Sequence, residues 1–320
     1  MHRLSVQTAP FDWLSDLAPA YAAQRAWHDG SYCEQRFFHY VYQPDGPFSI
    51  ACGAALLAEH IRHFRFSPAL IQQLGQVTDA QGRSQFDESF LNHLQRLQLR
   101  VQVNAAPEGA VLLPGEPLLT VEGPLAQIYL LESAFRHLFW HSTHWATQAS
   151  MQRWKRRRFK EEDTPSAPQY AFNPEGWKIR AAYIGGASAD EILKNVGENA
   201  RPMKPDEGLT LMGPPAEEPL VQVRRLFKGT QPLADLWLSE SDEAQASVSR
   251  THVSFYDEQT RQLNTLQLTR FQNLYQPVLL KGHSAIASPR LAYLRQRSLK
   301  QLEALHKVGL EHYPRGHYAG

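Results

Sequence analysis

The stretch PEGAVLLPGEPLLTVEGPLAQIYLLES, residues 107–133, places two turn signals among short apolar runs and then begins a helix. The turns are PEG (107–109) and PGEP (114–117), and the second is followed by the run LLTVEG (118–123). Apolar residues on both sides of a turn that contains Pro and Gly are typical of hairpins. We therefore predict a compact β-meander that leads into a long helix over residues 124–156. By pattern alone, such a ribbon is a scaffold.

On the N-terminal side of this ribbon, helical and strand patterns alternate along the chain. Helices are predicted where apolar residues recur every three or four positions, and strands where they alternate. Pro19 falls in the first turn of the first helix, Gly30 is placed to end it, and Asp87 is placed to cap the last one. The predicted helices cover residues 14–28 and 86–99, and the predicted strands cover 36–43 and 99–105. Residues 48–64 are predicted to be a short strand or entry turn followed by a helix.

On the C-terminal side, Ser188 and Glu191 have the spacing of a capping box at the start of a helix. The Pro- and Gly-rich residues 197–219 are predicted to be a linker. The remaining predictions are a short buried strand or helix over 178–186, antiparallel strands over 220–269, an amphipathic helix over 291–310 and an exposed tail over 311–320.

Composition excludes several classes of protein. The 320 residues carry a formal net charge of +1, so no bulk field favours nucleic acid or an anionic membrane. The two cysteines, Cys33 and Cys52, are too few for a disulfide framework or a zinc site. The first 17 residues lack the apolar core of a signal peptide, and no run reaches the roughly 20 apolar residues of a membrane helix. We therefore expect a cytoplasmic protein without a metal site.

One basic run needs its own interpretation. WKRRRFKEED (154–163) places five cations before three acids, so a nucleic-acid-binding protein acting through residues 153–160 is one alternative. A solvated helix end is the other, because cations are stabilised near the negative C-terminus of a helix. The nearby acids and the scarcity of aromatic residues favour the solvated helix end.

Several motifs taken together resemble the nicotinate phosphoribosyltransferase family of NAD salvage. The ribbon of residues 107–125 matches the family's motif almost position by position. The other similar stretches are LSDLAPAYAAQRAWHDG (14–30), FSIACGAALLAEHIRHFRFS (48–67), FDESFLNHLQRLQL (86–99), RAAYIGG (180–186) and the C-terminal residues 276–318. The resemblance implies an α/β (α+β) sandwich packed beside a catalytic (β/α)₈ barrel, in a head-to-tail dimer whose active site lies at the barrel mouth.

The chain is too short for that barrel. Only about 65 residues separate Trp154 from Val221, which allows about two βα units of roughly 30 residues each. We therefore expect an α+β sandwich with an incomplete, vestigial (β/α) barrel segment. The predicted division is an N-terminal sandwich part (1–125), a long helix with a barrel remnant and linker (126–219), and C-terminal strands and a helix that complete the sandwich (220–320).

Residues that the resemblance makes functional are also missing. Ala18 stands where the family stacks a Tyr on the nicotinate ring, and Gln148 stands where the family has Lys. Residues 164–176 contain no Arg, and residues 145–251 contain no His, although the family uses paired arginines and a phosphorylated histidine there. GHS at 282–284 is similar to the histidine loop, but its order in the chain predicts a surface turn.

These departures favour a nicotinate phosphoribosyltransferase-like pseudoenzyme without independent activity: a non-catalytic paralogue or partner-binding form. The alternative is an active enzyme that makes nicotinate mononucleotide from nicotinate and phosphoribosyl diphosphate with ATP hydrolysis. Phosphoribosyl diphosphate, ATP and Mg²⁺ are expected only in that case. No catalytic residue or metal ligand is assigned. By resemblance, the substrate-binding residues are Arg180, Tyr183, Gly185 and Gly186.

A partner is expected where the family's barrel once covered the sandwich. The resemblance implies a homodimer, or a complex with an intact phosphoribosyltransferase, and no contact with a membrane. The segments that would line this face carry the aromatic residues Tyr21, Trp27, Phe37, Phe38 and Tyr40. We expect part of this set to form an exposed apolar patch.

Overall fold

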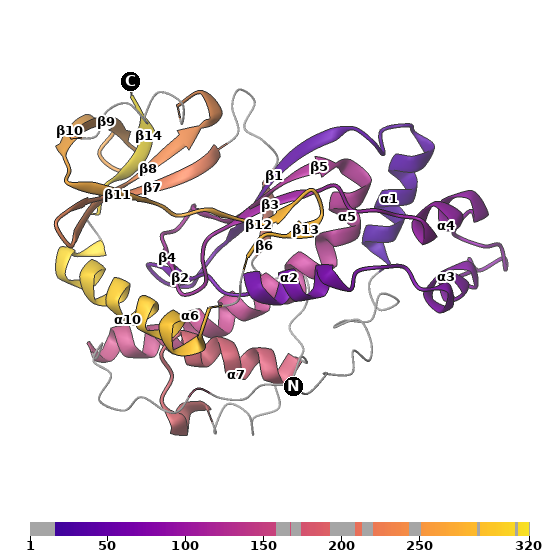
Figure 1. The fold of residues 1–320 in the computed structure, drawn as a ribbon, viewed down its shortest axis with the longest axis horizontal. Helices are drawn as coiled ribbons and strands as arrows, with labels where there is room; N and C mark the ends of the chain where they lie inside the picture. Colours follow the sequence, from indigo (N-terminus) through magenta and orange to yellow (C-terminus); the bar gives the residue numbers. More distant parts are fainter. Residues whose placement is uncertain are drawn as a thin grey trace.

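The structure is a computed structural model in which two six-stranded sheets and several helices form a mixed α/β molecule (Figure 1). The mixed fold class is therefore confirmed. The residues that the structure describes are 17–157, 167, 174–192, 209–212, 220–242, 251–286, 289–310 and 313–319.

The first sheet combines strands from both halves of the chain. Its order is β13-β12-β3-β5-β1-β6, and all of its neighbours pair antiparallel. Because β12 pairs with β3, the C-terminal part of the chain extends the sheet built by the N-terminal part. The strands are β1 (Gln35–Tyr42), β3 (Gln102–Ala105), β5 (Pro117–Pro124), β6 (Leu209–Met212), β12 (Gln276–Leu280) and β13 (His283–Ser284).

The ribbon of residues 107–133 is not a simple meander. Strand β4 (Val111–Leu112) pairs with β2 (Ser49–Ile50), whereas β5 pairs with β3 and β1. The backbone of Ala51 bonds to Gly109 and Ala110, which draws β4 away from β5. The expected β4–β5 pairing is therefore wrong, because β4 pairs with residues 61 and 63 positions earlier in the chain rather than across the PGEP turn.

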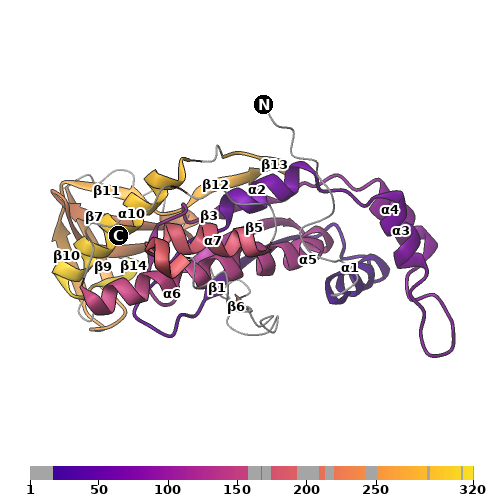
Figure 2. The same cartoon turned by 90° about the horizontal axis from the view of Figure 1, so that it is seen from below.

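The predicted long helix is present and is continuous with a π-helical turn in its middle. It consists of α5 (Leu125–Ala134), the π segment η1 (Phe135–Trp140) and α6 (His141–Arg156). Figure 2 shows these segments as one rod running along the molecule, with α7 (Pro174–Ile184) beside α6. Phe135 and Leu138 are fully buried in the core that this rod shares with the first sheet.

Of the other helices, α2 (Ala54–Arg62) packs against the β12–β13 edge of the first sheet, α1 (Ala18–His28) packs against α5, and α3 (Pro68–Gly75) packs against α4 (Glu88–Gln95). The structure contains α1, α2 and α4 within the predicted ranges. It also contains α3, which the sequence analysis missed although Ser67 accepts a capping hydrogen bond from the Leu70 N–H. Asp87 occupies the cap position of α4, but its carboxylate lies 2.8 Å from the His28 ring instead of bonding to the helix.

The second sheet is built entirely by the C-terminal part of the chain. Its order is β10-β9-β14-β8-β7-β11, from β7 (Leu220–Lys228), β8 (Gln231–Ser239), β9 (His252–Asp257), β10 (Leu263–Gln267), β11 (Arg270–Asn273) and β14 (Arg315–Tyr318). The sheet curls, because its two edge strands are separated by only Leu268 and Thr269 in the chain. The N–H groups of these two residues donate to Thr251 near β9 and to Phe227 of β7.

The tail was expected to be exposed over residues 311–320, but of its described residues, 313–319, only His317 and Ala319 are exposed. Strand β14 lies between β8 and β9 in the middle of the second sheet, and Tyr313 is fully buried. The hydroxyl of Tyr313 donates to Asp235 Oδ1 at 3.2 Å. The aromatic residues of the tail therefore contribute to the fold. The predicted amphipathic helix before it is α10 (Leu291–Val308), which buries Leu294, Leu299, Leu302 and Leu305 and is capped by Gly309.

The barrel remnant is not confirmed. In the part of residues 126–219 that the structure describes, the chain forms α5, η1, α6 and α7, and the strand β6 pairs antiparallel with β1. Residues 178–184 are helical, so of the two predicted alternatives for this stretch the helix is confirmed and the short strand is wrong. Most of the predicted linker lies outside the described residues. None of the described helices is long and apolar enough to cross a membrane.

Two glutamates of the ribbon connect these parts. Glu108, in the PEG turn, faces α7, and Glu116, in the PGEP turn, faces the second sheet. Glu116 accepts a hydrogen bond from the Leu113 N–H at 2.7 Å and lies beside the buried pair Arg225–Asp235. Arg225 also donates to the carbonyl of Val111 at 3.0 Å. The ribbon is thus a scaffold with a buried acid at each turn.

Candidate functional site

Arg180 projects from α7 into a fully buried ion pair with Glu108. Nη1 of Arg180 lies 2.8 Å from Oε1 of Glu108, and Nη2 contacts Oε2, which makes the pair bidentate. The same carboxylate accepts the Gly53 N–H at 2.8 Å at the start of α2. Burial alone raises the pKa of Glu108, but the Arg180 charge and these hydrogen bonds outweigh it and hold the pKa below its ordinary value.

Cys52 lies against this pair. Its Sγ atom is 3.5 Å from Arg180 Nη1 and 4.0 Å from Glu108 Oε1. Burial, together with the negative charge of Glu108, raises the pKa of the Cys52 thiol to about 12. The thiol is therefore protonated at neutral pH and is not a nucleophile.

The other three predicted substrate-binding residues hold α7 against its neighbours. The Tyr183 carbonyl accepts a hydrogen bond from Arg295 Nη1 at 2.9 Å, and the Gly185 carbonyl accepts one from the Ser150 hydroxyl at 2.6 Å. A Cβ atom on Gly185 would lie 2.1 Å from the Ala146 carbonyl oxygen, so only glycine allows α6 and α7 to approach this closely. Gly186 has a φ of +97° and ends the helix.

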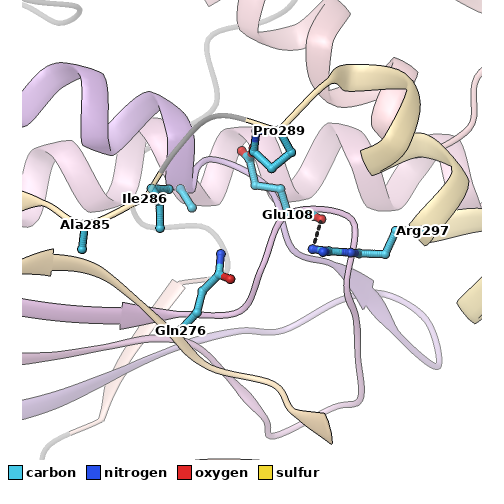
Figure 3. A pocket seen from close by; sticks show the side chains of 7 residues that line it. Glu108, Gln276, Ala285, Ile286, Pro289 and Arg297 are labelled. Carbon is cyan, nitrogen blue, oxygen red and sulfur yellow. Dashed lines mark hydrogen bonds between the residues drawn. The ribbon is translucent and has the colours of Figure 1, made fainter.

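A cavity of about 240 Å³ opens next to the Glu108 turn. Figure 3 shows the amide of Gln276 and the guanidinium of Arg297 reaching toward the same space, with Ile286 and Pro289 on its opposite side. Nη1 of Arg297 donates to the backbone carbonyl of Glu108 at 3.2 Å. The lining residues are Ala54, Glu108, Gln276, Ala285, Ile286, Pro289 and Arg297.

Four different parts of the chain position these side chains. Ala54 is the first residue of α2, Gln276 is the first residue of β12, and Glu108 lies in the ribbon. Pro289 lies just before α10, and Arg297 lies within it. Of the four residues predicted from resemblance, only Arg180 contacts this site, through Glu108. None of the four lines this cavity. The lining residues that the structure describes offer one carboxylate, one carboxamide and one guanidinium as polar groups.

A second cavity, of about 260 Å³, lies on the α6–α7 hairpin. Its lining residues include His144, Trp145, Gln148 and Glu191. Gln148 is the residue for which the resemblance implied a Lys. His144 Nδ1 lies 3.2 Å from the Tyr42 hydroxyl, and burial lowers the pKa of His144. Glu191 is already engaged by Arg156 at 3.0 Å and by the Ser188 N–H at 2.8 Å, which confirms the predicted capping box.

The remaining predicted positions have structural roles. Ala18 begins α1. His283 lies in the short hairpin between β12 and β13, which confirms the surface turn at 282–284. In the basic run, Arg156 pairs with Glu191, and residues 158–160 lie outside the described part of the chain. The described residues contain no group of three or more His, Cys, Asp or Glu side chains able to hold a metal ion.

The expected aromatic patch is packed rather than open. Tyr40 is 1% exposed, Tyr21 stacks on Phe86 with ring centroids 4.9 Å apart, and Trp27 contacts Tyr32 at the same separation. Phe38 packs partly buried on the core. These side chains therefore contribute mainly to the sandwich itself.

Sequence reasoning missed Gln276 and Arg297, because no local pattern connects them. One signal was available for Glu108 and Glu116: each is an acid within a turn that is flanked by apolar runs. A charged residue at such a position is buried only when it is paired.

Comparison with known proteins identifies relatives of the N-terminal part. Residues 14–138 match the family of the nicotinate phosphoribosyltransferase (NAPRTase) N-terminal domain. Nicotinate phosphoribosyltransferases from Rattus norvegicus and Homo sapiens are each 33% identical over 141 residues. Each match covers 43% of this chain and 26% of the relative, so it spans about a quarter of the relative's length.

The fold is similar over a longer range. The crystal structure of human nicotinic acid phosphoribosyltransferase superimposes with a TM-score of 0.69 and 15% sequence identity. The superposition covers 95% of this chain and 97% of the human chain. At this identity the similarity concerns the fold alone.

Proposed function

We propose that this chain is a non-catalytic member of the nicotinate phosphoribosyltransferase family that acts in NAD salvage by binding a partner protein. One observation carries the proposal. Arg180, the only cation among the four residues matched to the family's site, is 0% exposed and is bound on both nitrogen arms by Glu108. A guanidinium held in this way has no face left for a substrate.

The chemistry of the reaction supports the same conclusion. Phosphoribosyl transfer develops positive charge on the ribose while diphosphate leaves, so the enzyme must hold several phosphate groups with cations. Among the described residues, the cavity beside Glu108 has one cationic lining residue, Arg297, and the cavity beside α6 and α7 has none. The sequence adds no Arg in residues 164–176 and no His in residues 145–251.

The partner in this proposal is a second copy of this chain or an intact member of the family. Strand β10 is an edge strand, and its Leu263 is 65% exposed directly opposite Tyr256 of β9, which is 40% exposed. An edge strand with exposed apolar side chains is a template for pairing with another chain. This edge is the surface on which we expect the partner to bind.

Two measurements test the proposal. Calorimetry of the purified chain with nicotinate and phosphoribosyl diphosphate, with and without Mg²⁺-ATP, is expected to show no binding, whereas an intact family enzyme serves as the positive control. Light scattering is expected to show a dimer that Leu263→Lys dissociates, while Leu280→Lys on the first sheet leaves it intact. Saturable binding of both substrates would contradict the non-catalytic assignment. A monomer that also captures no intact family enzyme would contradict the partner.

A further inference from the structure

Two buried carboxyl groups face a single guanidinium where the ribbon meets the second sheet. Arg225 on β7 donates to Asp235 on β8 through Nε at 2.8 Å and through Nη2 at 2.6 Å. Glu116 in the PGEP turn lies beside this pair, and each of the three residues is at most 2% exposed. We propose that Glu116 and Asp235 share one proton, and that this shared proton makes the contact between the ribbon and the second sheet sensitive to pH.

The hydrogen bonds of Glu116 indicate which of its oxygens carries the proton. Oε2 accepts the Leu113 N–H at 2.7 Å, whereas Oε1 is buried and meets no donor among the described residues. A negatively charged oxygen that is buried without a donor is unfavourable. A protonated Oε1 instead donates to the neighbouring Asp235 carboxylate, in a short and charge-assisted O–H···O⁻ hydrogen bond.

The charges of this cluster balance only when one of the two acids is protonated. Arg225 is the cation that faces both acids, and α10 contributes the neutral amide of Gln301, 3.5 Å from Nη1 of Arg225. Arg315 of β14 is partly buried and donates to the Pro114 carbonyl at 2.6 Å. With both acids ionised, Arg225 and the two carboxylates would bury a net charge of one negative unit, which is costly.

The two tyrosines of the cluster stay neutral. Burial is the main cause that raises the pKa of both phenols well above 10, in Tyr275 just before β12 and in Tyr313 just before β14. Tyr313 donates to Asp235 Oδ1 at 3.2 Å, and Tyr275 donates to the Pro117 carbonyl at 2.8 Å. The proton on Glu116 is therefore the charge of this cluster that pH can switch.

This proton joins two parts of the fold. Glu116 belongs to the ribbon, whose strand β5 lies in the first sheet, and Asp235 belongs to the second sheet. The two carboxyl groups attract each other while the proton is bound and repel each other once it is lost. The pKa of Glu116 is well above 4.5 in the folded chain, so opening of the contact releases a proton at any pH between these two values. Opening therefore becomes easier as the pH rises, by up to about tenfold per pH unit.

The first test detects the proton by NMR of the full chain, labelled with carbon-13 in glutamate and assigned with Glu116→Gln. At neutral pH we expect the Glu116 carboxyl carbon to have the chemical shift of a protonated acid. Asp235→Asn should move this signal to the position of an ionised acid, because Glu116 is then the carboxylate that neutralises Arg225. The proposal is overturned if Glu116 is ionised in the unchanged chain, or if it stays protonated in Asp235→Asn.

The second test needs no substitution in the second sheet. Hydrogen exchange of β7 and β8 would be compared between the unchanged chain and Glu116→Gln at the same pH, so that the intrinsic exchange rates cancel. The ratio of the two rates should rise by up to about tenfold per pH unit between about pH 5 and about pH 7. Glu122→Gln, which replaces an exposed acid of β5, is the matched control and should exchange like the unchanged chain. A ratio that does not change with pH would contradict the pH-sensitive contact.

Discussion

Arg180 and Glu108 lie 72 positions apart in the chain and form a bidentate ion pair, with Nη1 2.8 Å from Oε1 and both side chains buried. The pair connects α7 with the ribbon, and the Gly53 N–H connects the same carboxylate with α2. A buried ion pair contributes little to the stability of the fold when it is compared with apolar residues of the same shape. Removal of one member is nevertheless destabilising, because it leaves the other charge buried and uncompensated.

The first prediction concerns this pair. Glu108→Gln is expected to lower the free energy of unfolding by about 3–5 kcal/mol, because the Arg180 charge then stays buried without a partner. Adding Arg180→Met to that variant should recover part of the loss. The measurement is urea denaturation. The control is Glu303→Gln, which removes an exposed pair with Lys307 and should change stability by less than about 1 kcal/mol. Equal effects of the two Gln variants would contradict the account.

The second prediction concerns the other glutamate of the ribbon. Burial and the neighbouring Asp235 charge raise the pKa of Glu116 well above its ordinary value of 4.5, although Arg225 opposes them. The folded chain therefore keeps a proton on Glu116 that the unfolded chain loses above pH 4.5. Stability from this group is complete below pH 4.5 and decreases as pH rises toward the folded pKa.

Glu116→Gln should remove this dependence, because an amide keeps the shape and the neutral charge of the protonated acid. The variant is expected to gain stability relative to the unchanged chain as pH rises from about 5 to about 8 in urea denaturation. A constant difference between the two proteins over that range would show that Glu116 does not hold its proton in the folded state.

The third prediction concerns the contact of α6 with α7. Gly185→Ala should destabilise the chain by about 1–3 kcal/mol, since its Cβ would meet the Ala146 carbonyl at 2.1 Å. Gly75→Ala in α3 is the matched control, because the nearest atom there is Leu91 Cδ1 at 3.4 Å. That control should be neutral or slightly stabilising, by up to about 1 kcal/mol. Thermal melts that rank the two variants the other way would contradict the close packing.

The fourth prediction concerns a histidine on the long helix. Burial, followed by the charges of His137 and His144, lowers the pKa of His141 from 6.5 to about 4. The unfolded chain therefore binds a proton here before the folded chain does, and stability is lost as pH falls from 6.5 toward 4. NMR titration of the His141 Cε1–H, assigned with His141→Gln, should give a midpoint near 4. A midpoint near the ordinary value would contradict the burial of this ring.

Local signals in the sequence predicted most of the elements. The Ser188–Glu191 capping box and the amphipathic helix α10 depend on residues within one or two helical turns, and both are present. The long helix was also predicted, but its π turn was not, because Phe135–Trp140 carries no breaker residue. Hydrophobic periodicity and helix caps depend on residues that are close in the sequence, so they can be recognised without knowledge of the tertiary structure.

Pairings between distant segments could not be predicted in this way. Strand β4 pairs with β2 instead of its neighbour β5, and Tyr313 is buried by strands more than 50 residues earlier in the chain. The candidate site has the same character, since Arg297 reaches Glu108 across 189 positions. Burial of these groups is decided by the packing of whole sheets, which no local pattern records.

The division into three segments and the vestigial barrel stay predictions. Strands β12 and β13 join the first sheet, and β7 to β11 with β14 form the second, so the C-terminal part contributes to both sheets. Of the linker, the four residues of β6 lie at the edge of the first sheet, next to β1.

The central proposal, that this chain has no phosphoribosyltransferase activity of its own, is tested most directly by a product assay. The chain would be purified from a host that lacks nicotinate phosphoribosyltransferase and incubated with labelled nicotinate, phosphoribosyl diphosphate and Mg²⁺-ATP. We predict no nicotinate mononucleotide above the level formed without protein. Product that increases in proportion to the amount of chain, and turns over many times per chain, would contradict the claim.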